Sequence, residues 1–142
     1  MKFSELVTQS GHDAEHIATY STLDDSAESL ARIKRRPEII QFAKTVTASM
    51  ATIAVEEEGA AIEWVPVALQ TDELCIKALN NDPLCFHLIK SDSDAVIDHA
   101  LSLAGDNLMY VPLDERTQQR CIDAVTRHSS AIRYCPPDVF DA

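Results

Sequence analysis

The chain has 142 residues, 46% of them hydrophobic, with 23 acidic and 12 basic side chains and a formal net charge of −11. This length fits one domain, residues 1–142, whose core needs neither a metal nor a disulfide. The negative field repels a phosphate backbone, so we expect no nucleic-acid partner. Three glycines and 6% aromatic residues disfavour a sandwich or barrel and predict an all-α fold.

No apolar stretch approaches the roughly 18 residues of a membrane span, and the N-terminus lacks the apolar segment of a signal peptide. We therefore expect a cytoplasmic protein with no membrane contact, and thiols stay reduced in that compartment. The four cysteines form no CxxC pair and are interpreted as small buried hydrophobic residues: Cys75, Cys85, Cys121 and Cys135.

Residues 1–44 are predicted to form an N-terminal helical segment, with a faint copy of the later repeat starting at Ser26. His12 and His16 have the spacing that places two imidazoles on one helical face, but two ligands do not make a metal site. We interpret them as surface histidines and predict no metal and no cofactor.

The sequence RIKRR holds four basic residues, Arg32, Lys34, Arg35 and Arg36, within an acidic chain. We interpret it as a solvated helix end before Pro37. The alternative is an electrostatic contact with an acidic partner, or with the Glu56, Glu57 and Glu58 run of a second copy.

A repeated register fills residues 45–137. A hydroxyl residue is followed four positions later by an apolar residue or a thiol, and three positions further by alanine. The register starts at Thr47, Thr71, Ser93 and Thr117, with spacings of 24, 22 and 24 residues. It is clearest between WVPVALQTDELCIKAL from Trp64 and YVPLDERTQQRCIDAV from Tyr110, which lie 46 residues apart. Threonine and serine are preferred N-caps, so a helix is predicted to begin after each one.

Each repeat is predicted to be a helical hairpin. Leu74, Cys75, Ala78 and Leu79 form an apolar stripe on one helical face, which must be buried. Breakers such as Gly105 then precede a second, shorter helix that ends before Pro66, Pro112 or Pro136. Hairpins of about 22 to 24 residues cannot bury their apolar faces alone, so they should stack into a solenoid-like body, with residues 138–142 as a tail.

Two further expectations concern aromatic residues. Trp64 and its counterparts Leu88, Tyr110 and Tyr134 are predicted to form a buried spine, the alternative being an exposed interface anchor. The segment from Tyr134 to Pro137 resembles half a unit and is expected to cap the stack; if it does not, two copies should pair there.

These repeats resemble the short tandem helical repeats of domain-of-unknown-function family 4116. The resemblance covers residues 45–137 and rests on Trp64-Val65-Pro66 through Ala78-Leu79, on Tyr110-Val111-Pro112 through Ala124-Val125, and on a truncated copy opening at Tyr134-Cys135-Pro136. The pattern fails at Leu88-Ile89-Lys90, where a tighter loop or a continuous helix is expected. The resemblance implies a repeat scaffold and supplies no catalytic residue.

The leading functional hypothesis is a non-catalytic protein-binding module. Its binding face would use polar positions that vary between units: Asp72, Glu73, Asp94, Gln118 and Gln119. A narrower version is a small acidic antagonist or immunity-type protein that binds a basic target. The alternative class is a small cytosolic enzyme with a Cys/His or metal site, but Cys75 and Cys121 occupy repeat slots that hold Ile97 and Ala51 elsewhere, which favours packing.

Overall fold

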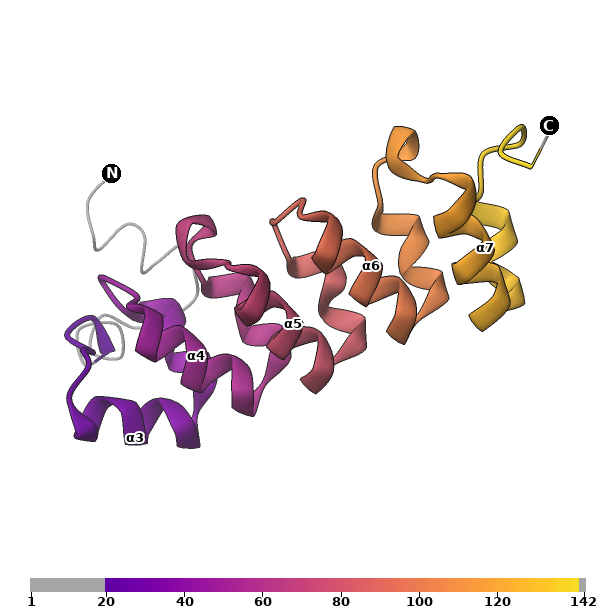
Figure 1. Cartoon of the computed structure of the whole chain (residues 1–142). Coiled ribbons are helices and arrows are strands. Elements are labelled where there is room, and N and C mark those ends of the chain that lie inside the picture. Colours follow the sequence, from indigo (N-terminus) through magenta and orange to yellow (C-terminus); the bar gives the residue numbers. More distant parts are fainter. Residues whose placement is uncertain (1–19, 141–142) are drawn as a thin grey trace, which may run out of the picture.

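The computed structural model describes residues 20–140, and this part of the chain is helical, without a β-strand (Figure 1). The predicted all-α fold is confirmed. Its α-helices are α3 (Ala27–Arg35), α4 (Ala48–Glu57), α5 (Asp72–Asn81), α6 (Asp94–Leu103) and α7 (Gln118–Arg127). His12 and His16 lie outside the described residues. None of the described helices combines the length and the apolar character that a bilayer crossing requires.

A six-residue 3₁₀ helix follows each of these five α-helices. These are η1 (Pro37–Phe42), η2 (Gly59–Trp64), η4 (Pro83–Leu88), η5 (Gly105–Tyr110) and η7 (Ser129–Tyr134). One extended residue joins the two helices each time, with φ between −139° and −149°, and its N–H donates to the carbonyl four residues earlier. The second, shorter helix predicted for each unit is therefore present, and it is a 3₁₀ helix.

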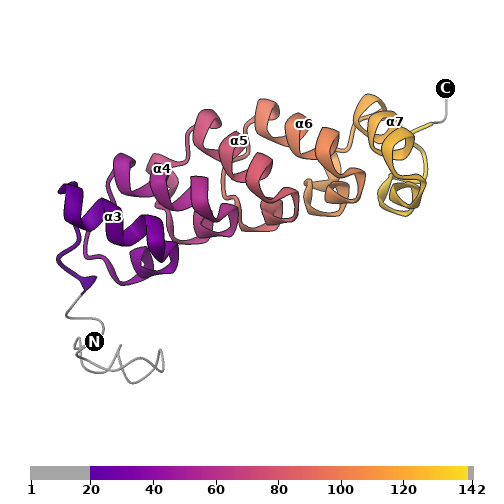
Figure 2. The ribbon, with the colours of Figure 1, turned by 90° about the horizontal axis from the view of Figure 1, so that it is seen from below.

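The α-helices lie side by side in chain order, from α3 at one end to α7 at the other (Figure 1). Each α-helix contacts the next one, and the 3₁₀ helices form a second layer beside them (Figure 2). α3 and η1 share this order, with Ser26 at the N-cap. The boundary proposed at residue 45 stays a prediction.

Hydroxyl residues precede each α-helix at the N-cap. The side chains of Thr47, Thr71 and Thr117 accept hydrogen bonds from the backbone N–H three residues later, as predicted. Ser93 occupies the same position before α6, but its hydroxyl makes no capping bond. The expectation of a capping hydroxyl was wrong for this unit.

The core runs along the junction of the two layers. Leu74, Cys75, Ala78 and Leu79 are all buried, which confirms the predicted apolar face of α5. The thiols of Cys75, Cys85 and Cys121 are buried as well, whereas Cys135 is only partly buried.

The predicted aromatic spine is wrong. Tyr110 is 47% exposed, and Trp64, Leu88 and Tyr134 are only partly buried. Each is the last residue of a 3₁₀ helix, and Trp64, Leu88 and Tyr134 pack against the core with only part of their surface. The buried positions are the third residue, which is buried in all five of the six-residue 3₁₀ helices, and the fourth, which is buried as Ile40, Ile62, Phe86 and Leu108 but exposed in η7.

The linkers between units are of two lengths. η3 (Val67–Leu69) and η6 (Leu113–Glu115) add one 3₁₀ turn to the linkers after η2 and η5. The linker after η4 is two residues shorter and has no such turn, so the tighter loop expected near Leu88 is observed and the continuous helix is not. The last residue before the N-cap fastens each long linker.

Gln70 and Arg116 are these fastening residues. The buried Gln70 amide donates to Val65 O at 3.0 Å, and its Oε1 accepts from Lys90 N of the next unit at 2.9 Å. Arg116 repeats this bridge, donating to Val111 O and, across to the next unit, to Tyr134 O, both at 2.8 Å.

Candidate functional site

The basic cluster lies on α3, at one end of the row of helices. The Arg32 guanidinium lies 5.2 Å from the centre of the Tyr20 ring, and Arg36 Nε is 3.2 Å from Glu38 Oε1. Lys34 and Arg35 are exposed. A hollow of about 260 Å³ lies here, lined by Tyr20, Arg32, Arg35, Arg36 and Ile39. The cluster is a local positive end of an otherwise acidic chain.

The predicted polar residues divide into two groups. Asp72 and Glu73 are exposed in the first turn of α5, where Glu73 lies 4.0 Å from Lys77 Nζ. Asp94, Gln118 and Gln119 lie at the starts of α6 and α7. Asp94 and Gln119 contact residues that line a sizeable groove, Arg120 and Asp123 respectively, whereas none of the five predicted residues lines it.

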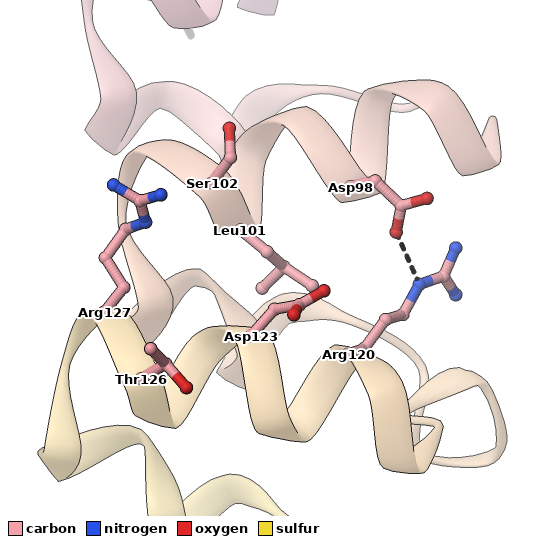
Figure 3. Close-up of a pocket in the computed structure, with 7 residues that line it drawn as sticks. All are labelled: Asp98, Leu101, Ser102, Arg120, Asp123, Thr126 and Arg127. Carbon is pink, nitrogen blue, oxygen red and sulfur yellow. Dashed lines mark hydrogen bonds and ion pairs between the residues drawn. The ribbon is translucent and has the colours of Figure 1, made fainter.

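That groove lies between α6 and α7 and has a volume of about 630 Å³ (Figure 3). Asp98 and Arg120 meet near one end, while Arg127 extends from α7 toward Ser102 at the other (Figure 3). Leu101 forms an apolar floor between the two ends. The remaining lining residues are Asp123 and Thr126. We call this hollow the α6–α7 groove.

Arg120 occupies a slot that is apolar in the three preceding helices. The residue three positions after the N-cap is Met50 in α4, Leu74 in α5 and Val96 in α6, all of them buried. Arg120 stands at this position in α7, with a side chain only 12% exposed. The charged Arg120 side chain therefore lies between α6 and α7, whereas the earlier helices place a buried apolar side chain at this position.

Three acceptors hold the Arg120 guanidinium. Its Nε donates to Asp98 Oδ1 and its Nη2 donates to Asp94 Oδ1, both at 2.9 Å. Its Nη1 donates to Glu115 O at 3.0 Å. Burial alone lowers the pKa of Arg120, but the hydrogen bonds and charges of Asp94 and Asp98 raise it. Arg120 thus stays charged and fixes this end of the groove.

The other end of the groove presents open hydrogen-bonding groups. Arg127 is exposed and has no hydrogen-bonding or ionic partner within residues 20–140. The Thr126 hydroxyl donates to Ile122 O, and Asp123 accepts from Gln119 Nε2 at 2.9 Å. A guanidinium, two hydroxyls and carboxylates within one groove can bind polar and charged side chains of either sign.

The environments of the three buried cysteines oppose a nucleophilic role. Burial raises the pKa of Cys75 to about 11, and it raises those of Cys85 and Cys121 to about 12. The reactive thiolate is therefore scarce at neutral pH. Among residues 20–140, no three His, Cys, Asp or Glu side chains are grouped so that they could hold a metal ion.

The predicted sites missed Arg120, Asp98, Asp123 and Arg127. The signal was present in the repeat itself, because Arg120 breaks an apolar position that Met50, Leu74 and Val96 keep. A charged residue in a repeated core slot needs partners, and Asp98 is its partner on the preceding helix.

No family model, curated protein or solved structure matches the chain. The resemblance to domain-of-unknown-function family 4116 stays a prediction.

Proposed function

We propose that the chain is a solenoid-like stack of helical repeats that binds another protein and catalyses no reaction. The recurring order of N-cap, α-helix, extended joint and 3₁₀ helix, with contacts between successive α-helices, supports the stacked arrangement. Such stacks are stabilised by contacts between neighbours, which leaves one face of each unit available for binding. The high pKa values of the buried thiols favour this role over a thiol-dependent enzyme.

The α6–α7 groove carries the proposal for the binding site. Arg120 keeps a charged group in a slot where Met50, Leu74 and Val96 pack as hydrocarbon. Its carboxylate partners Asp94 and Asp98 stay 85% and 62% exposed, so these ion pairs add little stability, and a cation at this position fits a binding role better than a packing role.

The proposed partner is a basic protein. Residues 45–142 contain 16 acidic and 6 basic side chains, a net charge of −10. This field attracts a positively charged surface and repels nucleic acid and anionic membranes. An acidic antagonist of a basic target, with an immunity-type role, is the narrower form of the proposal. The free thiols fit the cytoplasm as its compartment.

The test is affinity capture from the native host with three forms of the chain. The wild type is compared with Ser102→Arg/Thr126→Arg, which fills the groove, and with Ala48→Arg/Ser49→Arg, which places the same two cations on exposed positions of α4. We expect a basic protein that the wild type and the α4 variant retain and the groove variant loses. A set of captured proteins that is identical for all three forms would contradict the proposed site.

A second measurement tests the charge argument. The complex with the captured protein should weaken steeply between about 50 mM and about 500 mM salt, because screening shortens the range of the acidic field. An affinity that does not change over this range removes the antagonist form of the proposal.

A further inference from the structure

Polar bridges join neighbouring α-helices at one repeated position. Lys77 Nζ of α5 donates to Glu56 Oε1 of α4 at 3.0 Å. His99 Nε2 of α6 lies 2.7 Å from Asn80 Oδ1 of α5. In both bridges the oxygen belongs to the ninth residue after the N-cap of one helix, and the nitrogen belongs to the sixth residue after the N-cap of the next. These units therefore set an acceptor opposite a donor.

Ser102 and Asp123 have the same two positions between α6 and α7, and no hydrogen bond joins these two described side chains. The Ser102 hydroxyl donates to His99 O of its own helix at 2.6 Å, and the Asp123 carboxylate accepts from Gln119 Nε2 of its own helix at 2.9 Å. Both side chains are exposed. The bridge is missing because a carboxylate stands where the earlier helices place a donor nitrogen.

The α6–α7 groove lies at this missing bridge. Ser102 and Asp123 both line it, with Leu101 between the two helices (Figure 3). Between α3 and α4 the same positions hold Arg35 and Ile53, and an isoleucine side chain forms no hydrogen bond. Within residues 20–140, the α6–α7 groove is therefore the junction where two polar groups at these positions lack the donor that would join them.

The charges of the groove leave Asp123 without a cation. Arg120 is already paired with the two carboxylates of α6. Arg127 follows Asp123 by one helical turn, but no ion pair joins these two described residues, and the Arg127 side chain extends toward Ser102 (Figure 3). The Asp123 carboxylate is thus available to a cation from outside the chain.

We propose that the ammonium group of a lysine from the partner protein binds in the α6–α7 groove, between Ser102 Oγ and the Asp123 carboxylate. Lys77 beside Glu56 is an example of this contact within the chain. The Ser102 oxygen keeps lone pairs that can accept from an ammonium, and Leu101 offers an apolar surface to the lysine stem. The inference rests on the proposed binding of a basic protein and adds the side chain that this protein inserts.

Titration of the isotope-labelled full chain with hexalysine, followed by NMR at about 50 mM salt, tests this contact. We expect the amide shifts of Ser102 and Asp123 to saturate with one dissociation constant. Hexalysine that is acetylated on every side chain has no ammonium groups there and should leave these shifts unchanged.

Asp123→Asn keeps the size of the side chain and should raise the dissociation constant at least about 10-fold, because the hydrogen bond loses its charge. Asp114→Asn is the matched control, since Asp114 is an exposed carboxylate outside the groove, and it should change the constant by less than about 2-fold. Shifts that spread over the acidic surface, or groove shifts that Asp123→Asn leaves unchanged, overturn the lysine contact.

Two further variants test the sign and the place of the bound charge. Ser102→Lys supplies an ammonium from α6 itself and should abolish the shifts that hexalysine causes at Asp123. Arg127→Gln removes a like charge from the groove and should tighten hexalysine binding about 2- to 5-fold. Weaker binding by Arg127→Gln, or undiminished binding by Ser102→Lys, contradicts a lysine at this position.

The affinity capture separates this inference from the proposed function. We expect Asp123→Asn to lose the basic protein that the wild type retains. If Asp123→Asn retains it and Ser102→Arg/Thr126→Arg loses it, the groove remains the binding site and the lysine contact is wrong. If Ser102→Arg/Thr126→Arg retains it too, the proposed binding site itself fails.

Discussion

Gly59 and Gly105 mark the closest approaches between neighbouring units. Each begins a 3₁₀ helix, and a Cβ atom at these residues would lie 2.4 Å from Ala78 O and 2.3 Å from Ala124 O, respectively. The backbone N–H of each also donates across the unit boundary, from Gly59 to Asn81 Oδ1 and from Gly105 to His128 Nδ1. These glycines let two backbones touch.

Gly59→Ala and Gly105→Ala should each lower the free energy of unfolding by about 1–3 kcal/mol, because the neighbouring backbone must move to accept the methyl group. Urea unfolding measures the change. Ser129 has the same register in η7 and is exposed, so Ser129→Ala should stay within about 0.5 kcal/mol of the wild type. Equal effects at all three positions would contradict the proposed close contact.

A substitution of Arg120 can distinguish a role in packing from a role in partner binding. In Arg120→Leu the apolar slot of α4, α5 and α6 is restored, while Asp94 and Asp98 stay solvated at 85% and 62% exposure. The unfolding free energy should remain unchanged or rise by up to about 2 kcal/mol, while binding of the captured partner is lost.

The matched variant Arg127→Leu removes an exposed cation and should change stability by less than about 0.5 kcal/mol. A loss of more than about 1 kcal/mol in Arg120→Leu, with partner binding retained, would show that Arg120 serves packing rather than recognition.

The buried thiols give stability a pH dependence at alkaline pH. Burial raises the pKa of Cys75 to about 11 and that of Cys121 to about 12, whereas the pKa of an unfolded thiol is about 8.5. Between these values the unfolded chain binds fewer protons than the folded chain, so stability falls as pH rises.

Thermal unfolding of Cys75→Ala/Cys121→Val should therefore show a shallower decline above about pH 9 than the wild type. The buried thiols of Cys75 and Cys121 should react with a disulfide reagent at neutral pH only after denaturant is added. Fast reaction of Cys75 or Cys121 in the native protein would contradict the burial.

At the scale of elements, the long linkers are held by one side chain each. Gln70 joins the carbonyl of Val65 to the N–H of Lys90 in the following unit. In Gln70→Met the side-chain volume is kept but these bonds are lost, and buried backbone groups remain unsatisfied. We expect a loss of about 1–3 kcal/mol in urea unfolding. The exposed Gln118→Met is the control and should be nearly neutral, so similar losses in both variants would refute this linker function.

The sequence was most informative where N-cap residues and apolar helical faces recur with the 46-residue period. Thr47, Thr71 and Thr117 could be assigned as N-caps, and the Leu74 to Leu79 face as core, because capping and helical periodicity are local properties. The exposure of Tyr110 and of Ile132 could not be predicted in this way. Tyr110 is exposed at the end of its 3₁₀ helix although another unit follows, and Ile132 is exposed where no described helix follows η7; composition encodes neither.

The candidate site also depends on contacts between units that the sequence pattern does not encode. Asp94 and Gln118 were identified as variable polar residues, but the α6–α7 groove arises from Arg120 in a core slot. The pairing of Arg120 with Asp98 depends on which helix follows which in space. The predicted register aligns Arg120 with Val96, and so it places a charged residue at a core position without identifying its partner.

At the scale of the whole molecule, the proposed stack makes stability a sum of unit and neighbour terms. Thr47 and Ser93 occupy equivalent N-cap positions 46 residues apart. Removing residues 48–93 therefore joins Thr47 directly to Asp94, so α6 follows the first unit in the place of α4. The pair of α6 and α7 with its groove remains intact.

Far-UV circular dichroism and urea unfolding of the chain lacking residues 48–93 test the stacked arrangement most directly. We expect an unchanged helical signal per residue and one cooperative transition at lower stability, whereas deletion of residues 48–81, which breaks the register, should abolish folding. If the in-register deletion unfolds as completely as the out-of-register one, the units are not equivalent and the proposed stack is wrong.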